Sequence, residues 1–464
     1  MTENRDKQYL FEAMPPARAL AAMAMPTIAS QLVNLVYNVV DTIFIGQTGD
    51  AYKTAAVTLA FTLFMMTVSF ANLFGIGGGS LIARLLGAGR RSAAKAVSSF
   101  AFHGAIASAL LYSAAVALTM EPLLRFLGAS DNTMGFCKQY VWVVVVLGNL
   151  PVILSMAVAH LLRSTGYSRQ AGIGLMVGSL LNVALDPLFM FVLLPPGLEV
   201  LGAALATLVS NIAASAYLVR TMARVAPEAA LGMDPRLIRR VGRAELRSLF
   251  GVGIPSALLT GLFDLANICL NALTAAHGDL QLAAMGIVMR AERLPNAINI
   301  GICQGMLPLV AYNYASGDHP RMRAFMRAAR TAGLAVSLAS MALFLSISSH
   351  VCGLFLDTGA ARDTAAAVAT LAFAATFLRI RCLASPLQFL NYSTSFAMQA
   401  VGYGSGTLLH ACFRELAFYI PFMFLLDRLF GLPGLTSAII AGEGAGALYA
   451  LLLFHRWKRR HLRP

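Results

Sequence analysis

Long apolar runs with few charges dominate the pattern of hydrophobic and polar positions along this chain. Short polar segments separate windows of roughly 20 residues or more that carry mostly aliphatic and aromatic side chains. A helix needs about 20 apolar residues to cross the hydrocarbon core of a bilayer. The pattern therefore predicts twelve transmembrane helices, near residues 20–45, 54–80, 96–119, 136–161, 172–193, 200–221, 249–275, 281–310, 328–349, 366–398, 404–427 and 434–455.

The composition supports an all-α integral membrane protein. Of the 464 residues, 58% are hydrophobic and only 12% are charged, whereas soluble domains carry about 25% charged residues. The first 19 residues are too polar for a cleavable signal peptide. The first predicted span is therefore expected to remain in the protein.

The basic residues are distributed unevenly between the two sides of the predicted membrane. The formal net charge is +14, and 25 Lys and Arg fall in segments on the side of the N-terminus. The segments on the opposite side hold five, namely Lys53, Arg125, Lys138, Arg362 and Arg428. Because short basic loops stay in the cytoplasm, both termini are expected to be cytoplasmic. The tail "HRWKRRHLRP" fits a lipid-headgroup anchor, so the charge requires no nucleic acid.

The two halves of the chain resemble each other. A basic segment, 222–248, separates residues 1–221 from residues 249–464. Pro26 and Gly49-Asp50 of the first half match Pro255 and Gly278-Asp279 of the second in the same order. Because six spans is an even number, both halves enter the membrane from the same side. The sequence predicts two six-helix bundles related by a pseudo-two-fold axis along the membrane normal, with substrate between them.

Polar side chains recur at helical spacing in two spans of the N-terminal half: Tyr37, Asn38 and Asp41 in one, Asn182 and Asp186 in the other. Residues three or four apart share a helix face, so the carboxamides and the phenol flank the carboxylates. Acidic groups inside a membrane are costly and usually functional. We expect the two spans to bring these side chains together.

Such a cluster can bind a coupling ion. Two neighbouring carboxylates out of water resist being ionised together, so one of them readily keeps a proton. The same oxygens also suit Na⁺, a hard cation, so H⁺ and Na⁺ both remain open. Pro187 follows Asp186 directly and removes a backbone hydrogen bond, which can free a carbonyl nearby.

The C-terminal half carries both signs of charge inside its spans. Because adjacent residues do not share a helix face, the neighbours Glu292 and Arg293, like Arg414 and Glu415, are expected to pair with side chains on other helices. The roles of Arg379, Arg381 and Arg414 stay open. Asp264 has no basic neighbour in sequence and is the first candidate for a substrate contact. Glu443 is the second.

No motif indicates enzymatic chemistry. The glycine-rich segment 74–90 lacks the GK[ST] of a phosphate-binding loop, and the chain contains no GxSxG or HExxH. The six cysteines are scattered without a CxxC spacing, so no disulfide framework or metal site is expected. The sequence predicts no cofactor other than the coupling ion.

Several motifs together resemble the MATE family of multidrug and toxin extrusion transporters. They are "LVYNVVDTIFIGQTGD", "GIGGGSLIARLLGAG", "LRSTGYSRQAGIGLMVGSLLNVALDPLFMF", "GAALATLVSN" and "GICQGMLPLVAYNYASGD". The chain looks most similar to the bacterial DinF-like and MepA-like branch. The resemblance implies a monomer in the bacterial cytoplasmic membrane with twelve helices in two bundles. It also implies export of organic cations and other amphipathic drugs by antiport against H⁺ or Na⁺.

The resemblance also assigns residues. It places an ion site in the N-terminal half at Asp41, Asn182 and Asp186, with Thr207 of "GAALAT" completing it. Gln304 lies in the family-like segment "QGMLPLVAYNY" and is a further candidate for substrate binding. A branch that couples through acids of spans seven and ten is disfavoured, because span ten, "SPLQFLNYSTSFAMQA", has no acid.

One alternative function stays open. A flippase for lipids or lipid-linked saccharides, from the same broad superfamily, would use a basic cavity for phosphate groups. Five intramembrane arginines are compatible with such a cavity: Arg290, Arg293, Arg379, Arg381 and Arg414. The sign of the charge in the central cavity would distinguish the two functions.

Overall fold

The computed structural model describes residues 2–46, 48, 50–355 and 365–462, and the regular secondary structure in this part is helical. Arg362, Arg463 and Gly49, used in the sequence argument, lie outside the described residues. The elements are α1 Thr2–Glu12, α2 Pro16–Gly46, α3 Ala51–Gly87, α4 Arg91–Phe126, α5 Asp131–Val141, η1 Trp142–Leu147, α6 Asn149–Ser164, α7 Ser168–Pro187, η2 Leu188–Leu193, α8 Glu199–Ala229, η3 Pro235–Arg240, α9 Arg243–Ala276, α10 Asp279–Ala315, α11 His319–Gly353, α12 Ala365–Arg381, η4 Cys382–Ala384, α13 Ser385–Ala400, α14 Gly404–Cys412, η5 Phe413–Tyr419 and α15 Ile420–His461.

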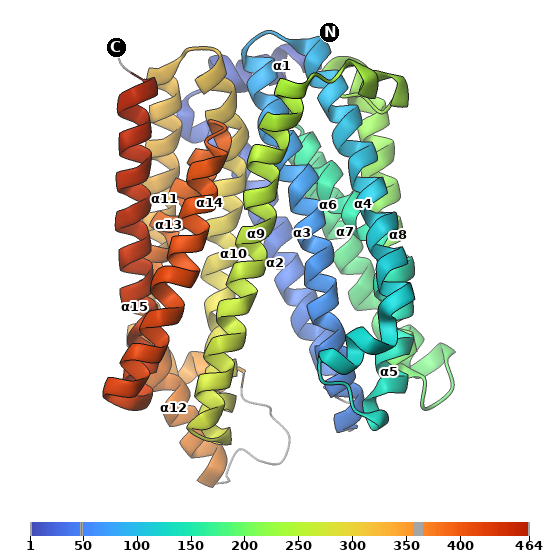
Figure 1. The fold of residues 1–464 in the computed structure, drawn as a ribbon, viewed down its shortest axis with the longest axis vertical. Helices are drawn as coiled ribbons and strands as arrows, with labels where there is room; N and C mark the ends of the chain where they lie inside the picture. Colours follow the sequence, from blue (N-terminus) through green and yellow to red (C-terminus); the bar gives the residue numbers. More distant parts are fainter. Residues whose placement is uncertain (1, 47, 49, 356–364, 463–464) are drawn as a thin grey trace.

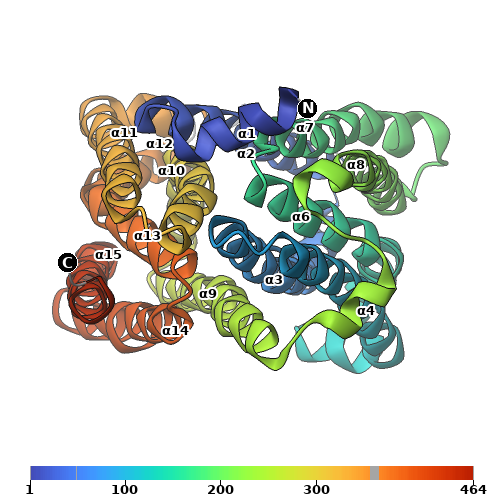
Figure 2. The same cartoon turned by 90° about the horizontal axis from the view of Figure 1, so that it is seen from above.

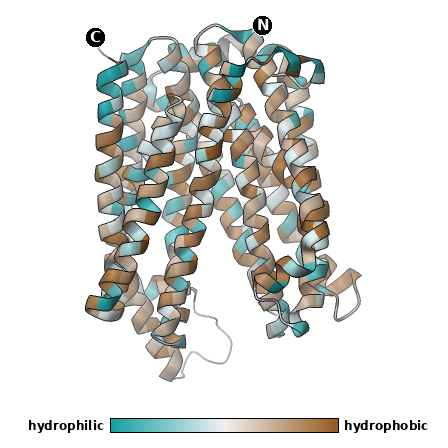
Figure 3. Cartoon of the chain, in the orientation of Figure 1, coloured by the Kyte–Doolittle hydropathy of each residue, from teal (hydrophilic) through white to brown (hydrophobic). Residues whose placement is uncertain are grey.

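The helices have the length and apolar character of membrane spans. Ten helical segments among the described residues can cross a bilayer, and the pair 131–147 and 149–164, bent by 45°, forms an eleventh. Apolar residues cover the middle of the molecule, and hydrophilic ones gather at the end with both termini (Figure 3). The prediction of an all-α membrane protein is confirmed.

The last helical segment contains two of the predicted spans. Gly404–His461 is 58 residues long, which at 1.5 Å per residue is far more than one bilayer crossing requires. At Gly431 the backbone adopts φ 61° and ψ −146°, a conformation that residues with a Cβ rarely adopt. Figure 1 shows the chain reversing direction there, so α14, η5 and the start of α15 descend while the rest of α15 returns.

The spans form two groups in space. We call α2–α8 (16–229) the N-terminal group and α9–α15 (243–461) the C-terminal group. They converge at the end that carries both termini and diverge at the opposite end (Figure 1). A shared hydrophobic cluster joins them at the first end, with Met23, Val252, Met306 and Phe396 among its members. Towards the opposite end, each group has a hydrophobic cluster of its own.

Small residues allow the two groups to approach closely. α3 packs against α9 and α10, and α2 packs against α10. A Cβ added at Gly77 would lie 2.7 Å from the carbonyl oxygen of Leu249, so this contact between α3 and α9 requires a glycine. Small residues of this kind let membrane helices pack closely.

The short helix α1 also connects the two groups (Figure 2). The Lys7 ammonium lies 4.6 Å from the ring centroid of Tyr167, in the N-terminal group. On the other side, the Tyr312 hydroxyl donates a 2.5 Å hydrogen bond to Glu12, and Arg321 donates to the carbonyls of Phe11 and Met14. The polar start of the chain therefore contacts both helix groups at the end where they converge.

Candidate ion-binding site

The carboxyl-terminal part of α7 holds the most deeply buried acid of the N-terminal group. Asp186 is fully buried, and its Oδ1 accepts a 3.2 Å hydrogen bond from Nδ2 of Asn182, one turn earlier. The same amide donates to Oγ1 of Thr207 on α8, at 3.4 Å. The three side chains predicted on spans five and six therefore lie together.

Asp41 approaches this cluster from α2, which packs against α7. Its carboxylate is half-buried and lies close enough to Asp186 for the two charges to interact. The phenol of Tyr37, one turn before Asp41, interacts with both carboxylates. Asn38 donates a 2.6 Å hydrogen bond to the carbonyl of Asn34 on its own helix. The structure thus brings Tyr37, Asp41 and Asp186 together.

Three buried oxygens of this cluster accept no hydrogen bond from the described residues. They are Oδ1 of Asp41, Oδ2 of Asp186 and Oδ1 of Asn182. Buried polar atoms are almost always hydrogen-bonded, so each exception requires an explanation. Carboxylate and amide oxygens are the ligands that hard cations prefer, and a carboxylate can also take a proton. The arrangement is suited to binding either a hard cation or a proton.

The backbone next to Asp186 departs from regular helix. Pro187 ends α7, and residues Leu188–Leu193 continue as a π-helical turn. Proline has no N–H to donate to the carbonyl four residues earlier, which explains why the α-helical ladder is interrupted here. π-helical turns of this kind occur frequently at functional sites.

Sequence reasoning missed Tyr140 as a member of the cluster. This residue of α5 is 8% exposed, and it interacts electrostatically with Asp41, Tyr37 and Asp186. The only signal in the sequence is a hydroxyl inside an otherwise apolar run, "YVWVVVVL". A tyrosine in such a run is compatible with either a core or an interface position, so the pattern alone could not select it.

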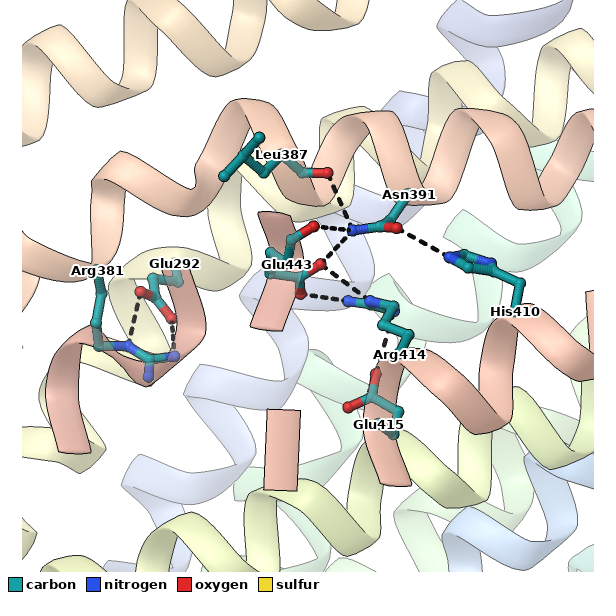
Figure 4. A network of polar contacts seen from close by, with 8 residues as sticks. All are labelled: Glu292, Arg381, Leu387, Asn391, His410, Arg414, Glu415 and Glu443. Carbon is teal, nitrogen blue, oxygen red and sulfur yellow. Dashed lines mark hydrogen bonds and ion pairs between the residues drawn. The ribbon is translucent and has the colours of Figure 1, made fainter. Parts of the chain in front are cut away.

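The C-terminal group contains a buried charged network, drawn in Figure 4. Arg414 binds Glu443 through Nε–Oε2 at 3.0 Å and Nη2–Oε1 at 2.5 Å. Nδ2 of Asn391 donates to the same Oε2 at 2.6 Å, and Oδ1 of Asn391 lies 2.9 Å from Nε2 of His410. Glu415 lies 3.2 Å from Nη1 of Arg414. Both carboxylate oxygens of Glu443, the second substrate candidate, therefore have partners.

A second buried pair joins α10 to α12. Arg381 donates to Glu292 from Nε at 2.9 Å and from Nη2 at 2.8 Å (Figure 4). The prediction that Glu292 and Arg414 have partners on other helices is confirmed, although Arg414 also contacts its sequence neighbour. Two-pronged pairing of this kind matches the planar guanidinium to the carboxylate.

The two remaining candidates lie apart from these clusters. Asp264 on α9 is half-buried and interacts electrostatically with Arg293 of α10, so it has a basic neighbour in space. No ion pair within 4.0 Å joins these two described residues. Gln304 on α10 faces a small cavity between the two helix groups, and its Oε1 has no hydrogen-bond partner among the described residues.

A model of the MatE family matches residues 26–188 and 255–425, more than half of the chain. The chain belongs to the MatE family. It is a multi-pass membrane transporter, and the members of this family are not enzymes. The resemblance inferred from the motifs is confirmed.

Relatives and solved structures of the MatE family match nearly the whole chain. The multidrug export proteins MepA of Staphylococcus aureus and of Staphylococcus saprophyticus are each 28% identical over 98% of this chain and 97% of their own. An outward-facing multidrug resistance MATE transporter of the MOP superfamily has a TM-score of 0.89 at 23% identity, covering 98% of both chains. A Pyrococcus furiosus MOP transporter, described as having a binding pocket of reversed polarity, has a TM-score of 0.88 at 24% identity and 99% coverage of both chains. These structures establish the fold.

Proposed function

We propose that this MatE-family protein is a secondary active exporter. It moves organic cations and other amphipathic drugs outward and takes up H⁺ or Na⁺ in exchange. The relatives that match its full length are named multidrug export proteins. Export against a concentration gradient needs an energy source, and an ion gradient supplies it when the transporter has a site for the coupling ion within the membrane.

The observation that carries this proposal is the set of unpaired oxygens in the N-terminal group. Asp41 and Asp186 are close together, and no basic side chain pairs with either among the described residues. Removing one partner from a buried charge pair costs about 3–5 kcal/mol, so acids without a basic partner need another source of compensation. A proton or Na⁺ supplies it, with Asn182 and Thr207 as neutral ligands and Tyr37, Asn38 and Tyr140 beside them.

Transport requires the ion and the drug to prefer different states of the protein. In the proposed cycle, residues 1–221 and 249–464 rock about a substrate held between them, and 222–248 links them. Ion binding changes how α2 bends or packs against α7. Each ligand needs different affinities for the two states, because otherwise one cannot drive the other. Asp264 is the first candidate for attracting a cationic drug, with Glu443 and Gln304 next.

The proposal includes an orientation and a location. The protein functions as a monomer in the bacterial cytoplasmic membrane, with both termini inside the cell. The diverging end of the two groups then faces outward. A single cysteine replacing Lys458 should react with an impermeant thiol reagent in inverted vesicles and stay unreactive in whole cells. The opposite result would reverse the orientation.

A lipid or lipid-linked saccharide flippase is the second candidate. Arg293 lies near Asp264, which makes the wall between α9 and α10 less acidic than the sequence indicates. A relative in fold is described as having a pocket of reversed polarity and a different function. Transport of a phosphate-bearing lipid, with no transport of organic cations, would favour this function.

The decisive experiment is flux of a fluorescent organic cation in proteoliposomes. A proton gradient alone and a sodium gradient alone are imposed on wild type, Asp41→Asn and Asp131→Asn. Asp131 is the matched control, because its carboxylate is 89% exposed at the start of α5, where it lies 3.4 Å from Arg125. We expect gradient-driven flux in wild type and in Asp131→Asn, and background flux in Asp41→Asn.

The outcomes separate the mechanisms. Flux driven only by the proton gradient identifies a protonation switch, whereas flux driven only by sodium identifies Asp41 and Asp186 as metal ligands. Full transport by folded Asp41→Asn would exclude the proposed coupling site. No flux of any organic cation under either gradient would exclude the exporter and leave the flippase.

A further inference from the structure

We propose that a small inorganic anion of about the size of chloride binds to Arg163, in a small, partly open cavity between the two helix groups. The cavity has a volume of about 20 Å³. Its polar wall consists of Ser80 from α3, His160, Arg163 and Ser164 from α6, and Gln304 from α10, with Phe396 of α13 on the apolar side. Both helix groups contribute to it.

Arg163 is the reason to expect an anion. Its side chain is only 4% exposed. Its guanidinium makes no hydrogen bond or ion pair with any described residue, and its buried Nε has no acceptor. A buried charge without a partner is strongly unfavourable. The position of Arg163 in the last turn of α6 compensates the charge only in part, because the helix dipole acts weakly.

Two other buried arginines of this protein have their charge compensated by an acidic side chain. Arg381 and Arg414 are equally buried, and each forms a two-pronged pair with a glutamate. No acidic side chain lines the cavity at Arg163. A negatively charged ligand is therefore needed to compensate Arg163, as the glutamates compensate Arg381 and Arg414.

The size and chemistry of the cavity select the ligand. A cavity needs roughly 10–15 Å³ to hold one water, so about 20 Å³ leaves room for a monatomic anion. A water molecule would satisfy a hydrogen bond but would leave the charge uncompensated. His160 and the side-chain amide of Gln304 line the same space and can donate to an anion. Chloride meets these requirements.

Arg84 is a second arginine, on α3, one turn after Ser80, at the contact between α3 and the C-terminal group. Its Nε donates to the carbonyl of Ser80 at 3.4 Å, and its Nη2 is buried without an acceptor among the described residues. The Ser80 hydroxyl donates a 2.5 Å hydrogen bond to the carbonyl of Gln399 in the C-terminal group. The anion would thus sit at a point where the two groups are already joined.

The position of the site predicts a consequence for the conformation. Arg163 belongs to the N-terminal group, and Gln304 and Phe396 belong to the C-terminal group. The cavity is complete only while the two groups are together at this end. A ligand that binds one arrangement more tightly increases its population, so the anion stabilises the arrangement described here.

The test is the effect of halides on thermal unfolding of the purified protein in detergent. Sodium gluconate is replaced by sodium chloride or sodium bromide at constant sodium concentration and ionic strength. We expect a saturable rise of the wild-type midpoint by at least about 2 °C. Arg163→Gln should lose this response. Arg125→Gln, which removes an arginine whose side chain is 55% exposed, should keep it.

Bromide provides a direct second measurement. Crystals grown in sodium bromide should show an anomalous peak within hydrogen-bond distance of the Arg163 guanidinium. Absence of both the peak and the wild-type halide response would overturn the proposal and leave a cavity that holds water. A halide response that persists in Arg163→Gln would also overturn it. If that variant does not fold, the bromide peak decides, because its presence supports the site and its absence excludes it.

Discussion

The two helix groups place opposite chemistry at comparable positions. In the N-terminal group, Asn182 and Asp186 are four residues apart and a π-helical turn follows at Leu188–Leu193. In the C-terminal group, His410 and Arg414 are four residues apart, and the π-helical turn is Phe413–Tyr419. The first cluster contains acids with no basic partner among the described residues. The second contains an arginine that holds Glu443 with two hydrogen bonds.

This difference indicates that the two clusters have different tasks. The oxygens of Asp41 and Asp186 that lack partners are free to gain and lose an ion, because nothing in the described chain competes for them. The oxygens of Glu443 are occupied by Arg414 and Asn391, so an incoming cation would have to displace a buried guanidinium. We infer that the first cluster serves the ion cycle and that the second fixes the packing of α13, η5 and α15.

Removing a charge from the first cluster is the strongest test of this difference between the clusters. Asp186→Asn should reduce gradient-driven transport to background, because an amide can neither take a proton nor hold a cation as strongly. The variant should unfold at the wild-type temperature or higher, since it removes a buried acid without a partner. Flux in proteoliposomes and thermal unfolding measure the two effects. Wild-type flux in Asp186→Asn would remove the distinction between the clusters.

Removing a charge from the second cluster should instead damage stability. Arg414→Met leaves Glu443 buried without its partner, which should destabilise the protein by about 3–5 kcal/mol. Thermal unfolding and the yield of monodisperse protein in detergent would report the loss. Whatever protein inserts should keep its ion dependence. A stable Arg414→Met that transports but has lost ion coupling would assign the second cluster to the cycle.

Asp264→Asn tests a site where the two signs of charge meet. With its acid removed, the wall near Arg293 should become net positive. We expect the KM for monovalent organic cations to rise by about tenfold. A change of this size corresponds to the loss of one charge–charge interaction at a half-buried site. The KM for neutral amphipathic substrates should stay within about twofold. Equal changes for both substrate classes would argue against charge pairing with the drug.

Thr207→Val should give the smallest effect. It removes one neutral oxygen, bonded to Asn182 at 3.4 Å, while it keeps the shape of the side chain. The loss of one weak hydrogen bond is worth about 0.5–1.5 kcal/mol, so the apparent affinity for the coupling ion should fall only a few-fold. Titration of transport against pH or sodium concentration measures the change. An unchanged midpoint would remove Thr207 from the site.

The sequence predicted much of this molecule because membrane helices carry strong local signals. Continuous apolar length specified the spans, including the reversal that is hidden inside a single 58-residue helical segment. The i, i+4 spacing of Asn182 and Asp186 specified their hydrogen bond. Both signals depend on neighbours along one helix, where the backbone geometry is known in advance.

The sequence could not predict contacts that depend on how helices pack. Glu443 had the same local appearance as Asp264, and only the position of Arg414 made it part of a closed ion pair. Tyr140 entered the ion cluster because α5 brings it there. In the sequence Arg163 was one basic residue among many, and only the fold showed that it is buried without a partner among the described residues.

The sequence by itself therefore determined the fold class, the family and the acids of the N-terminal cluster, because each of these rests on composition or on spacing along one helix. Only the tertiary structure decided which buried charges are compensated. The reason is physical: the free energy of a charge inside a membrane protein depends on the distance to atoms of other helices. Those distances arise only when the helices pack.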